Sequence, residues 1–494
     1  MQGELSANAT PEMHANPGVP TRPPAPKRMH YALLAAAYTA FAVYGSLVPL
    51  RFTPISCDAA IERFGRVPWL HLSIQHRADW VANLLLFIPL TFAWMGAATL
   101  DRHSRGGRWL IGGAIAAVAS VLSVALEFTQ LWFPPRTVSQ NDIAAETLGG
   151  LLGVAAWMAF GQSVSERARS FTADARPLRQ ADWMLQAYAL GFLIYAVLPL
   201  DLTLSLTEIG RKYKEGRVVL VPFLDLAKRP LSGLIDLAQD LAAFIPLGLL
   251  VATWGAPAGR PVRPLSVSLL LGAAIAAAIE GAQLLVYSRY TTTRDVLVGL
   301  IGAGLAWPIA RRCWGRGAER SEAEGSLRMG PALLLAGAGL HACLIAAASW
   351  APFRFTRDPA IIRPRLRGMW RTPFSSLYWG SEFHAVSQVL TKLLWFAPLG
   401  ALGLISIASA TASRPLRRWL AGAWALACLT YALGIELGQA LLPERVADAT
   451  DVGIGFAGVL LGMAVASRLL SRGEASGVAN AVVEALGPEL DERR

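Results

Sequence analysis

The chain has few charged residues and few cysteines for its length. Charged side chains make up 16% of its 494 residues, whereas 54% are hydrophobic, and the mean hydropathy is +0.42. A soluble domain carries about 25% charged residues, so this composition argues against an ordinary soluble enzyme or binding domain. The four cysteines show no CxxC spacing and the histidines share no ligand spacing, so neither a disulfide framework nor a metal or other cofactor is predicted. The sequence also contains no nucleotide-binding loop.

Apolar stretches near the length of a membrane span recur along the whole chain. A helix needs roughly 20 apolar residues to cross a hydrocarbon core of about 30 Å. Twelve such stretches are present, and they predict an all-α, polytopic membrane protein. Their approximate limits are 31–50, 80–100, 109–133, 143–160, 183–200, 233–254, 265–288, 295–310, 330–350, 386–409, 419–442 and 450–470.

One polar pattern occurs three times, each time running from the end of one apolar stretch into the next. A glutamate is followed by glutamine three, arginine nine and aspartate fifteen residues later. We call each set a quartet: Glu127, Gln130, Arg136 and Asp142; Glu280, Gln283, Arg289 and Asp295; Glu436, Gln439, Arg445 and Asp451. Because the spacing is unchanged and the copies lie roughly 155 residues apart, a single unit has been triplicated. Each unit then holds four spans, which gives three parallel four-helix repeats.

The repeats are expected at 30–163, 183–312 and 329–471, joined by cytoplasmic linkers at 164–182 and 313–328. Residues 1–29 are rich in proline and polar side chains and predict a disordered cytoplasmic tail, and 472–494 form a C-terminal tail. The first apolar stretch is too long for the core of a typical signal peptide and ends without a cleavage site. We therefore expect it to remain as the first span.

Short arginine-rich loops predict the orientation. The loops at 101–108, 256–264 and 411–418 and both linkers are rich in arginine, so we expect them in the cytoplasm. Four spans per repeat return the chain to its starting side, which makes the repeats parallel and both termini cytoplasmic. The quartets are then expected at the outer face. The net charge of +11 is explained by basic loops facing anionic lipid, and no nucleic-acid partner is predicted.

Other polar side chains are predicted at the depth of the quartets. Asp79 and Asn83 lie one helical turn apart at the start of the second span of the first repeat. Asp236 and Asp240 are their counterparts in the second repeat. An outer loop of about 30 residues precedes these positions in every repeat, too long for a simple turn and more typical of a folded cap or an interfacial segment. In the third repeat this loop is notably rich in arginine.

These residues resemble the VanZ-like family, whose pattern is an acid and an asparagine before Leu-Phe-x-Pro-Leu-Gly, then Glu-x-x-Gln, arginine, aspartate and a glycine-rich last helix. The first repeat matches it with Asp79, Asn83, Phe87, Pro89 and Gly149 besides its quartet. The third repeat departs most, with Gln388 and Lys392 in place of the acid and the asparagine. The resemblance implies a bacterial inner (cytoplasmic) membrane protein of cell-envelope or surface-polysaccharide biology, with a link to resistance to the lipoglycopeptide teicoplanin. It implies no settled reaction.

Several interpretations of the polar residues remain open. A carboxylate at the edge of the hydrocarbon costs about 2.5–3.5 kcal/mol, so the quartet glutamates need partners, for which the quartet arginines are the candidates. The quartets can serve only to lock the hairpin between the third and fourth spans. They can instead line an outward pocket for an anionic or glycosylated lipid head group, alone or with other envelope or polysaccharide-assembly proteins. A transporter of lipid-linked or small anionic substrates is an alternative. An outer-face hydrolase or transferase would use Glu127, Asp79 and Arg136.

Overall fold

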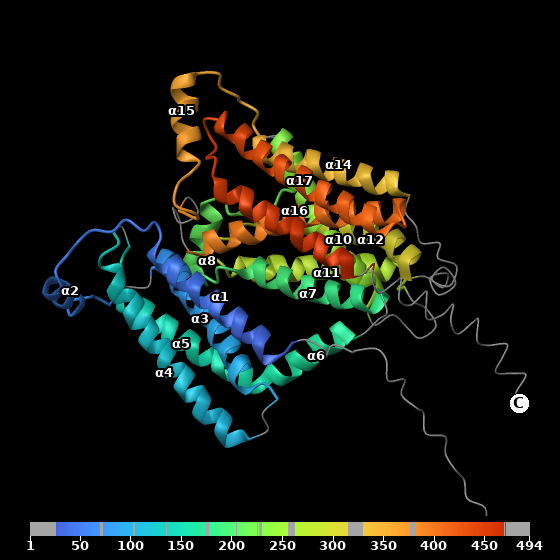
Figure 1. Ribbon diagram of the computed structural model, residues 1–494. Coiled ribbons are helices and arrows are strands. Elements are labelled where there is room, and N and C mark those ends of the chain that lie inside the picture. The colour runs from blue at the N-terminus through green and yellow to red at the C-terminus, as the bar shows by residue number, and fades with distance from the viewer. Residues whose placement is uncertain are drawn as a thin grey trace, which may run out of the picture.

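The computed structural model describes residues 26–69, 73–101, 104–134, 136–173, 177–203, 205–224, 226, 230–254, 262–314, 330–375, 382–468 and 470. Within these residues the chain is almost entirely helical, as predicted for the all-α class (Figure 1). The expected N-terminal tail, up to residue 25, and the expected C-terminal tail lie outside the described residues, as does most of the predicted linker 313–328.

The first repeat consists of four long helices and one short one. The long helices are α1 (Arg28–Leu47), α3 (Ile74–Thr99), α4 (Arg105–Gln130) and α5 (Gln140–Ala156), and α2 (Cys57–Phe64) is the short helix between α1 and α3. The chain continues from α5 through the π-helical turn η1 (Trp157–Gly161) into α6 (Gln162–Ala173). The predicted linker 164–182 therefore begins as helix.

The second and third repeats have the same order of elements. The second contains α7 (Pro177–Val197), α8 (Leu206–Lys214), α10 (Pro230–Thr253), α11 (Leu265–Leu284) and α12 (Thr293–Trp314), with β1 (Val218–Val219) paired in parallel to β2 (Thr291–Thr292). The third contains α14 (Pro331–Trp350), α15 (Pro359–Gly368), α16 (Glu382–Ala410), α17 (Arg414–Ala440) and a last helix, Ala449–Arg468. Each repeat thus places one short helix, α2, α8 or α15, between its first two long helices.

Ten of the twelve predicted spans correspond to helices that are long and apolar enough to cross a membrane, counted among the described residues. The other two predicted spans fall on α1, which has 20 residues, and α7, which has 21, and these helices are not among the ten. The chain is therefore a multi-span membrane protein.

Glycine allows the second and fourth helices of each repeat to pack closely. An added Cβ at these glycines would lie closer than van der Waals contact to an atom of the second helix: Gly149 to Leu84, Gly302 to Phe244 and Gly458 to Leu393. Small residues let transmembrane backbones approach in this way. Glycine at these positions therefore permits the close approach of the two helices.

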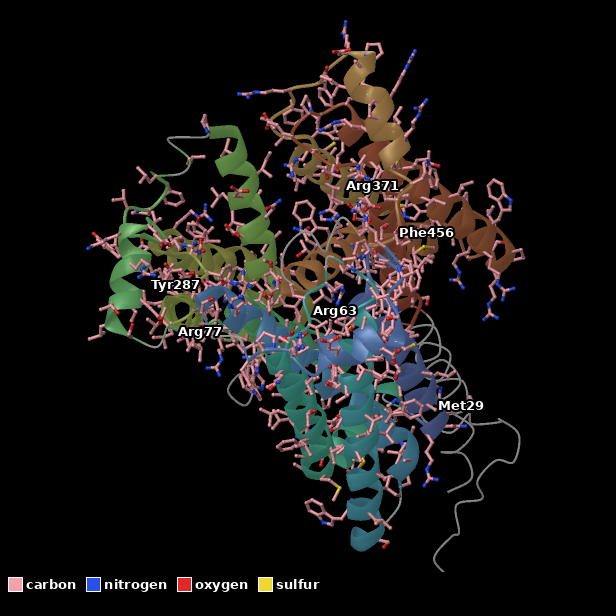
Figure 2. The ribbon with its side chains drawn as sticks, turned by 90° about the vertical axis from the view of Figure 1, so that its left-hand side faces the viewer. Met29, Arg63, Arg77, Tyr287, Arg371 and Phe456 are labelled. Atoms are coloured by element: carbon pink, nitrogen blue, oxygen red, sulfur yellow. The ribbon has the colours of Figure 1, made fainter. Side chains whose placement is uncertain are left out.

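The hairpins that carry the quartets and the short helices α2, α8 and α15 share one end of the bundle, at the left of Figure 1. We call it the quartet end, and Figure 2 shows it facing the viewer. At this end, residues of different repeats form direct contacts. Arg77 of α3 makes an ion pair of 3.2 Å with Glu208 of α8, and the Tyr44 hydroxyl of α1 donates to the carbonyl of Pro373 in the third repeat at 2.7 Å.

Candidate functional site

Each quartet glutamate is buried near the end of the third helix of its repeat and accepts a hydrogen bond from a main-chain N–H twelve residues later. In each repeat the donor N–H belongs to the residue directly before the first residue of the fourth helix. The three bonds are Ser139 N to Glu127 Oε2 at 3.1 Å, Thr292 N to Glu280 Oε2 at 2.6 Å, and Asp448 N to Glu436 Oε2 at 3.1 Å. The first N–H groups of a helix have no partner within the helix, and the glutamate oxygen supplies an acceptor at this point. The glutamates therefore fasten the hairpin in all three repeats.

Each quartet arginine donates hydrogen bonds to the first helix of its repeat. Arg136 bonds the carbonyls of Ser46 and Gly45 at 2.9 and 3.2 Å. The equivalent acceptors are Leu198 and Tyr195 for Arg289, and Ala351 and Ala348 for Arg445. These carbonyls belong to the last turn of the helix and its end, where no intrahelical donor is available. The arginines therefore join the first helix to the hairpin, a contact that sequence spacing did not predict.

A cis-proline follows the carbonyls bound by the arginine in every repeat. The cis bonds are Val48–Pro49, Leu198–Pro199 and Ala351–Pro352, and the next residue has a positive φ each time. The glutamine of the second repeat adds to this junction, because Gln283 Nε2 donates to the carbonyl of Ala196 at 3.1 Å. In the first repeat the equivalent glutamine, Gln130, is buried. The same backbone turn is thus built three times at the quartet end.

The quartet aspartates differ between repeats in their partners. In the first repeat Asp142 accepts from two neutral groups, Asn83 Nδ2 at 2.7 Å and Ser139 Oγ at 2.6 Å. Asp79, one turn before Asn83, is half-buried and interacts electrostatically with Asp142. Among the described residues, neither Asp79 nor Asp142 forms an ion pair with lysine or arginine. This site combines two carboxylates with amide and hydroxyl groups.

An internal cation occupies the corresponding place in the other two repeats. In the second, Arg294 pairs with Asp240 at 2.5 Å and with Asp295 at 3.1 Å. In the third, Lys392 stands at the position of Asn83 and pairs with Asp451. Asp236 of the second repeat is exposed, and Gln439 of the third is half-buried. The quartets are therefore alike in their hairpin contacts but not in the charged groups that surround their aspartates.

The comparison with known proteins agrees with the repeat structure. The VanZ/LLP1 family matches the chain three times, at residues 30–161, 186–314 and 340–471. The chain belongs to the VanZ/LLP1 family. No curated protein and no solved structure matches it. Each matched region includes the short helix and one quartet of its repeat.

A buried lysine of the second VanZ/LLP1 unit holds its short helix onto the hairpin. Lys212 of α8 is fully buried, and its Nζ donates to the carbonyls of Gln283 at 2.6 Å and Val286 at 2.7 Å. Burial lowers the pKa of Lys212 to about 8, and the nearby Asp201 carboxylate acts against this shift. Sequence reasoning missed this residue, since a lysine in an outer loop normally faces solvent.

In the third unit a cation of the short helix also donates to carbonyls of the hairpin, a contact we call a cation clamp. In the first unit the equivalent residue is an acid. Arg365 of α15 stands at the same distance from its cis-proline as Lys212, and it donates to the carbonyls of Leu442 and Pro443 and, at 2.9 Å, to that of Arg445. In the first unit this position is Glu62, whose side chain is 63% exposed and pairs with Arg66. An alignment of the three repeats on their cis-prolines would have shown this difference. In the first unit, the residue at the position of the clamping cation is thus an acid, which cannot donate to the hairpin carbonyls.

Proposed function

We propose that the protein binds a sugar-bearing lipid head group in its first repeat, in cell-envelope or surface-polysaccharide biology. The observation that carries the proposal is the difference between the three pockets. Asp79 and Asp142 lie near Asn83 and, among the described residues, neither forms an ion pair with lysine or arginine, although Arg136 and His76 act electrostatically on Asp79. In the second and third repeats, by contrast, Arg294 pairs with Asp240 and Asp295, and Lys392 pairs with Asp451. Carboxylate and amide groups are suited to the hydroxyl and amine groups of a sugar, because carboxylates only accept hydrogen bonds and asparagine both donates and accepts.

The same contacts favour a glycosylated head group over a purely anionic one. An anionic group needs cationic donors, and the bonds of Arg136 run to the carbonyls of Ser46 and Gly45. The first pocket instead presents two carboxylates, which repel phosphate. Asp79 and Asp142 are half-buried, so a ligand can reach them from the quartet end. The short helix of the first repeat also lacks the cation that closes the hairpins of the other two.

The decisive experiment transfers the cation of the third repeat to the first. Asn83→Lys installs beside Asp142 the ion pair that Lys392 forms with Asp451. The matched control, Lys392→Asn, makes the opposite change in the third repeat. The full-length protein in nanodiscs is titrated with fluorescent glucosyl-diacylglycerol, and with diacylglycerol and phosphatidylglycerol as comparison lipids. We expect Asn83→Lys to weaken glucosyl-lipid binding at least tenfold, and Lys392→Asn to leave it unchanged.

A second experiment tests the proposed site in living cells. Cells that lack the native gene and carry one variant are assayed for surface polysaccharide and for teicoplanin tolerance, with the membrane level of each variant checked by blot. We expect a defect for Asn83→Lys and none for Lys392→Asn. Equal binding of all three lipids by the native protein, or unchanged glucosyl-lipid binding by Asn83→Lys, contradicts a sugar site in the first repeat.

A further inference from the structure

The short helix of the third repeat is strongly basic. The segment from Pro352 to Arg371, which includes α15, has six arginines and one acidic residue, Asp358. The Asp358 side chain caps the start of α15, because it accepts a hydrogen bond from the N–H of Ala360 at 2.9 Å. The segment therefore presents a cationic surface at the quartet end.

The segment is held firmly in place. Arg365 anchors α15 to the hairpin carbonyls of Leu442, Pro443 and Arg445. The next anchor is Met369, which is buried and whose carbonyl accepts from Ala449 N at 3.0 Å. These two contacts fix the position of α15 relative to the hairpin.

The axis of α15 runs across the ends of the spans. In Figure 1 the long helices of the third repeat run roughly from left to right and α15 lies crosswise at their quartet end, extending beyond α14. In Figure 2, which faces that end, α15 again lies in the plane of the picture at the edge of the molecule. A helix that lies crosswise at the ends of the spans and at the edge of the bundle is placed where it can run along a membrane surface.

Exposed arginine and apolar side chains alternate on this segment. Arg363 and Arg367 are exposed, and Ile361, Leu366 and Trp370 are also exposed, with Trp370 at 78%. Arginine beside large apolar and aromatic side chains is typical of helices that lie in a membrane interface, where cations meet phosphate and apolar groups enter the acyl boundary. The equivalent helix α2 has Asp58 and Glu62 against Arg63 and is not basic.

We propose that α15 is an interfacial helix that binds the phosphate groups of anionic lipids at the quartet end of the third repeat. Guanidinium groups bind phosphate oxygens bidentately, and the charge of the segment selects an anionic surface over a zwitterionic one. The surface is formed by Arg363, Arg367 and Trp370. It is separate from the carboxylate pocket of the first repeat, so either proposal can fail without the other.

Hydrogen–deuterium exchange of the full-length protein tests this proposal. The protein is reconstituted in nanodiscs of phosphatidylcholine alone or with 30% phosphatidylglycerol, and exchange is followed for residues 359–371. We expect phosphatidylglycerol to slow exchange and 0.5 M salt to reverse the effect, because salt screens charges at a membrane surface. Arg363→Gln/Arg367→Gln should reduce the protection about fivefold per arginine, the equivalent of about 1 kcal/mol each. Arg363→Lys/Arg367→Lys should keep most of it.

The control is Arg51→Gln/Arg66→Gln, which removes the same charge from exposed positions of the first repeat. It should retain the protection of 359–371. Equal exchange in both lipids, or equal loss in the control, overturns the proposal. Protection by pyrophosphate in detergent that matches the effect of phosphatidylglycerol also overturns it, since the ligand is then a soluble phosphate. Thermal stability of each variant is measured first, and a destabilised glutamine pair is replaced by Trp370→Ser, which should also reduce protection.

Discussion

The amide of Asn83 donates to a carboxylate oxygen of Asp142 across 2.7 Å, and this bond joins the second helix of the first repeat to its fourth. In the third repeat a lysine occupies the same position and forms an ion pair with Asp451. The hairpin contacts made by Glu127 and Glu436 are nevertheless the same. The hairpin contacts, which we call the frame, are therefore constant, while the polar side chains around the quartet aspartate, which we propose line a pocket, vary. Substitutions in the frame should act alike in all three repeats, and substitutions in the pocket should not.

Removing a quartet glutamate should destabilise each repeat to a similar extent. Glu127→Ala, Glu280→Ala and Glu436→Ala each leave the buried main-chain N–H of the fourth helix without its acceptor. An unsatisfied buried donor costs about 1–3 kcal/mol. We expect a loss of that size for each alanine variant, measured as the free energy of unfolding in mixed detergent micelles titrated with sodium dodecyl sulfate.

The matched glutamine variants separate hydrogen bonding from charge. A glutamine side chain retains an oxygen that accepts from the same N–H, so its cost should be well below that of alanine. If Glu127→Gln loses glucosyl-lipid binding while its stability matches that of Glu280→Gln and Glu436→Gln, Glu127 contributes to the pocket as well as to the frame. Unequal stability losses among the three alanine variants would contradict a constant frame.

The cation clamps of the second and third repeats should each hold a short helix in place. Lys212→Met leaves the buried carbonyl of Val286 without its lysine donor, which costs about 1–3 kcal/mol, while the carbonyl of Gln283 keeps its bond from the N–H of Val286. We expect hydrogen exchange to speed up in α8 and in residues 283–292, and not elsewhere. Glu62→Gln changes the equivalent exposed position of the first repeat and should alter exchange in neither repeat. Unchanged exchange in Lys212→Met would show that apolar contacts, not the lysine, hold α8.

The same lysine predicts a pH dependence. Burial lowers the pKa of Lys212 from 10.5 to about 8; Arg217 acts in the same direction, and Asp201 and Glu280 act against it. Between these two pKa values, Lys212 binds a proton when α8 is detached from the hairpin and unfolded, but not when α8 is folded in place. The stability of the contact between α8 and the hairpin therefore rises with pH in that window. Below pH 8 the ammonium is charged in both states and this gain is absent.

Exchange of residues 283–292, corrected for the intrinsic rate at each pH, measures this effect. We expect additional protection to develop between pH 8 and pH 10 in the native protein. Lys212→Met has no titrating group at this position, and its corrected exchange should remain flat over the same range. A native profile as flat as that of Lys212→Met would show that the ammonium keeps its ordinary pKa when buried.

Much of the fold was predictable because its signals are local or repeated. The lengths of the apolar runs predicted the spans, and the repeated spacing from Glu127 to Asp142 predicted three hairpins of one kind. The contacts between segments far apart in sequence were not predictable. Arg136 bonds carbonyls about 90 residues earlier, and Lys212 bonds carbonyls about 70 residues later. Nothing in the local sequence distinguishes these cations from solvated ones, since a tertiary contact alone decides their partners.

The orientation of the bundle in the membrane is a prediction that native cysteines can test. Cys57 is exposed at the first residue of α2, at the quartet end, and Cys313 lies near the end of α12, at the opposite end of the spans. We expect a membrane-impermeant maleimide to label Cys57 in spheroplasts without permeabilisation. Cys57→Ser should abolish that labelling, and Cys313→Ser should leave it unchanged. Labelling of Cys57 only after permeabilisation would place the quartet end in the cytoplasm, which would move the proposed sugar site and the α15 surface to the inner face of the membrane.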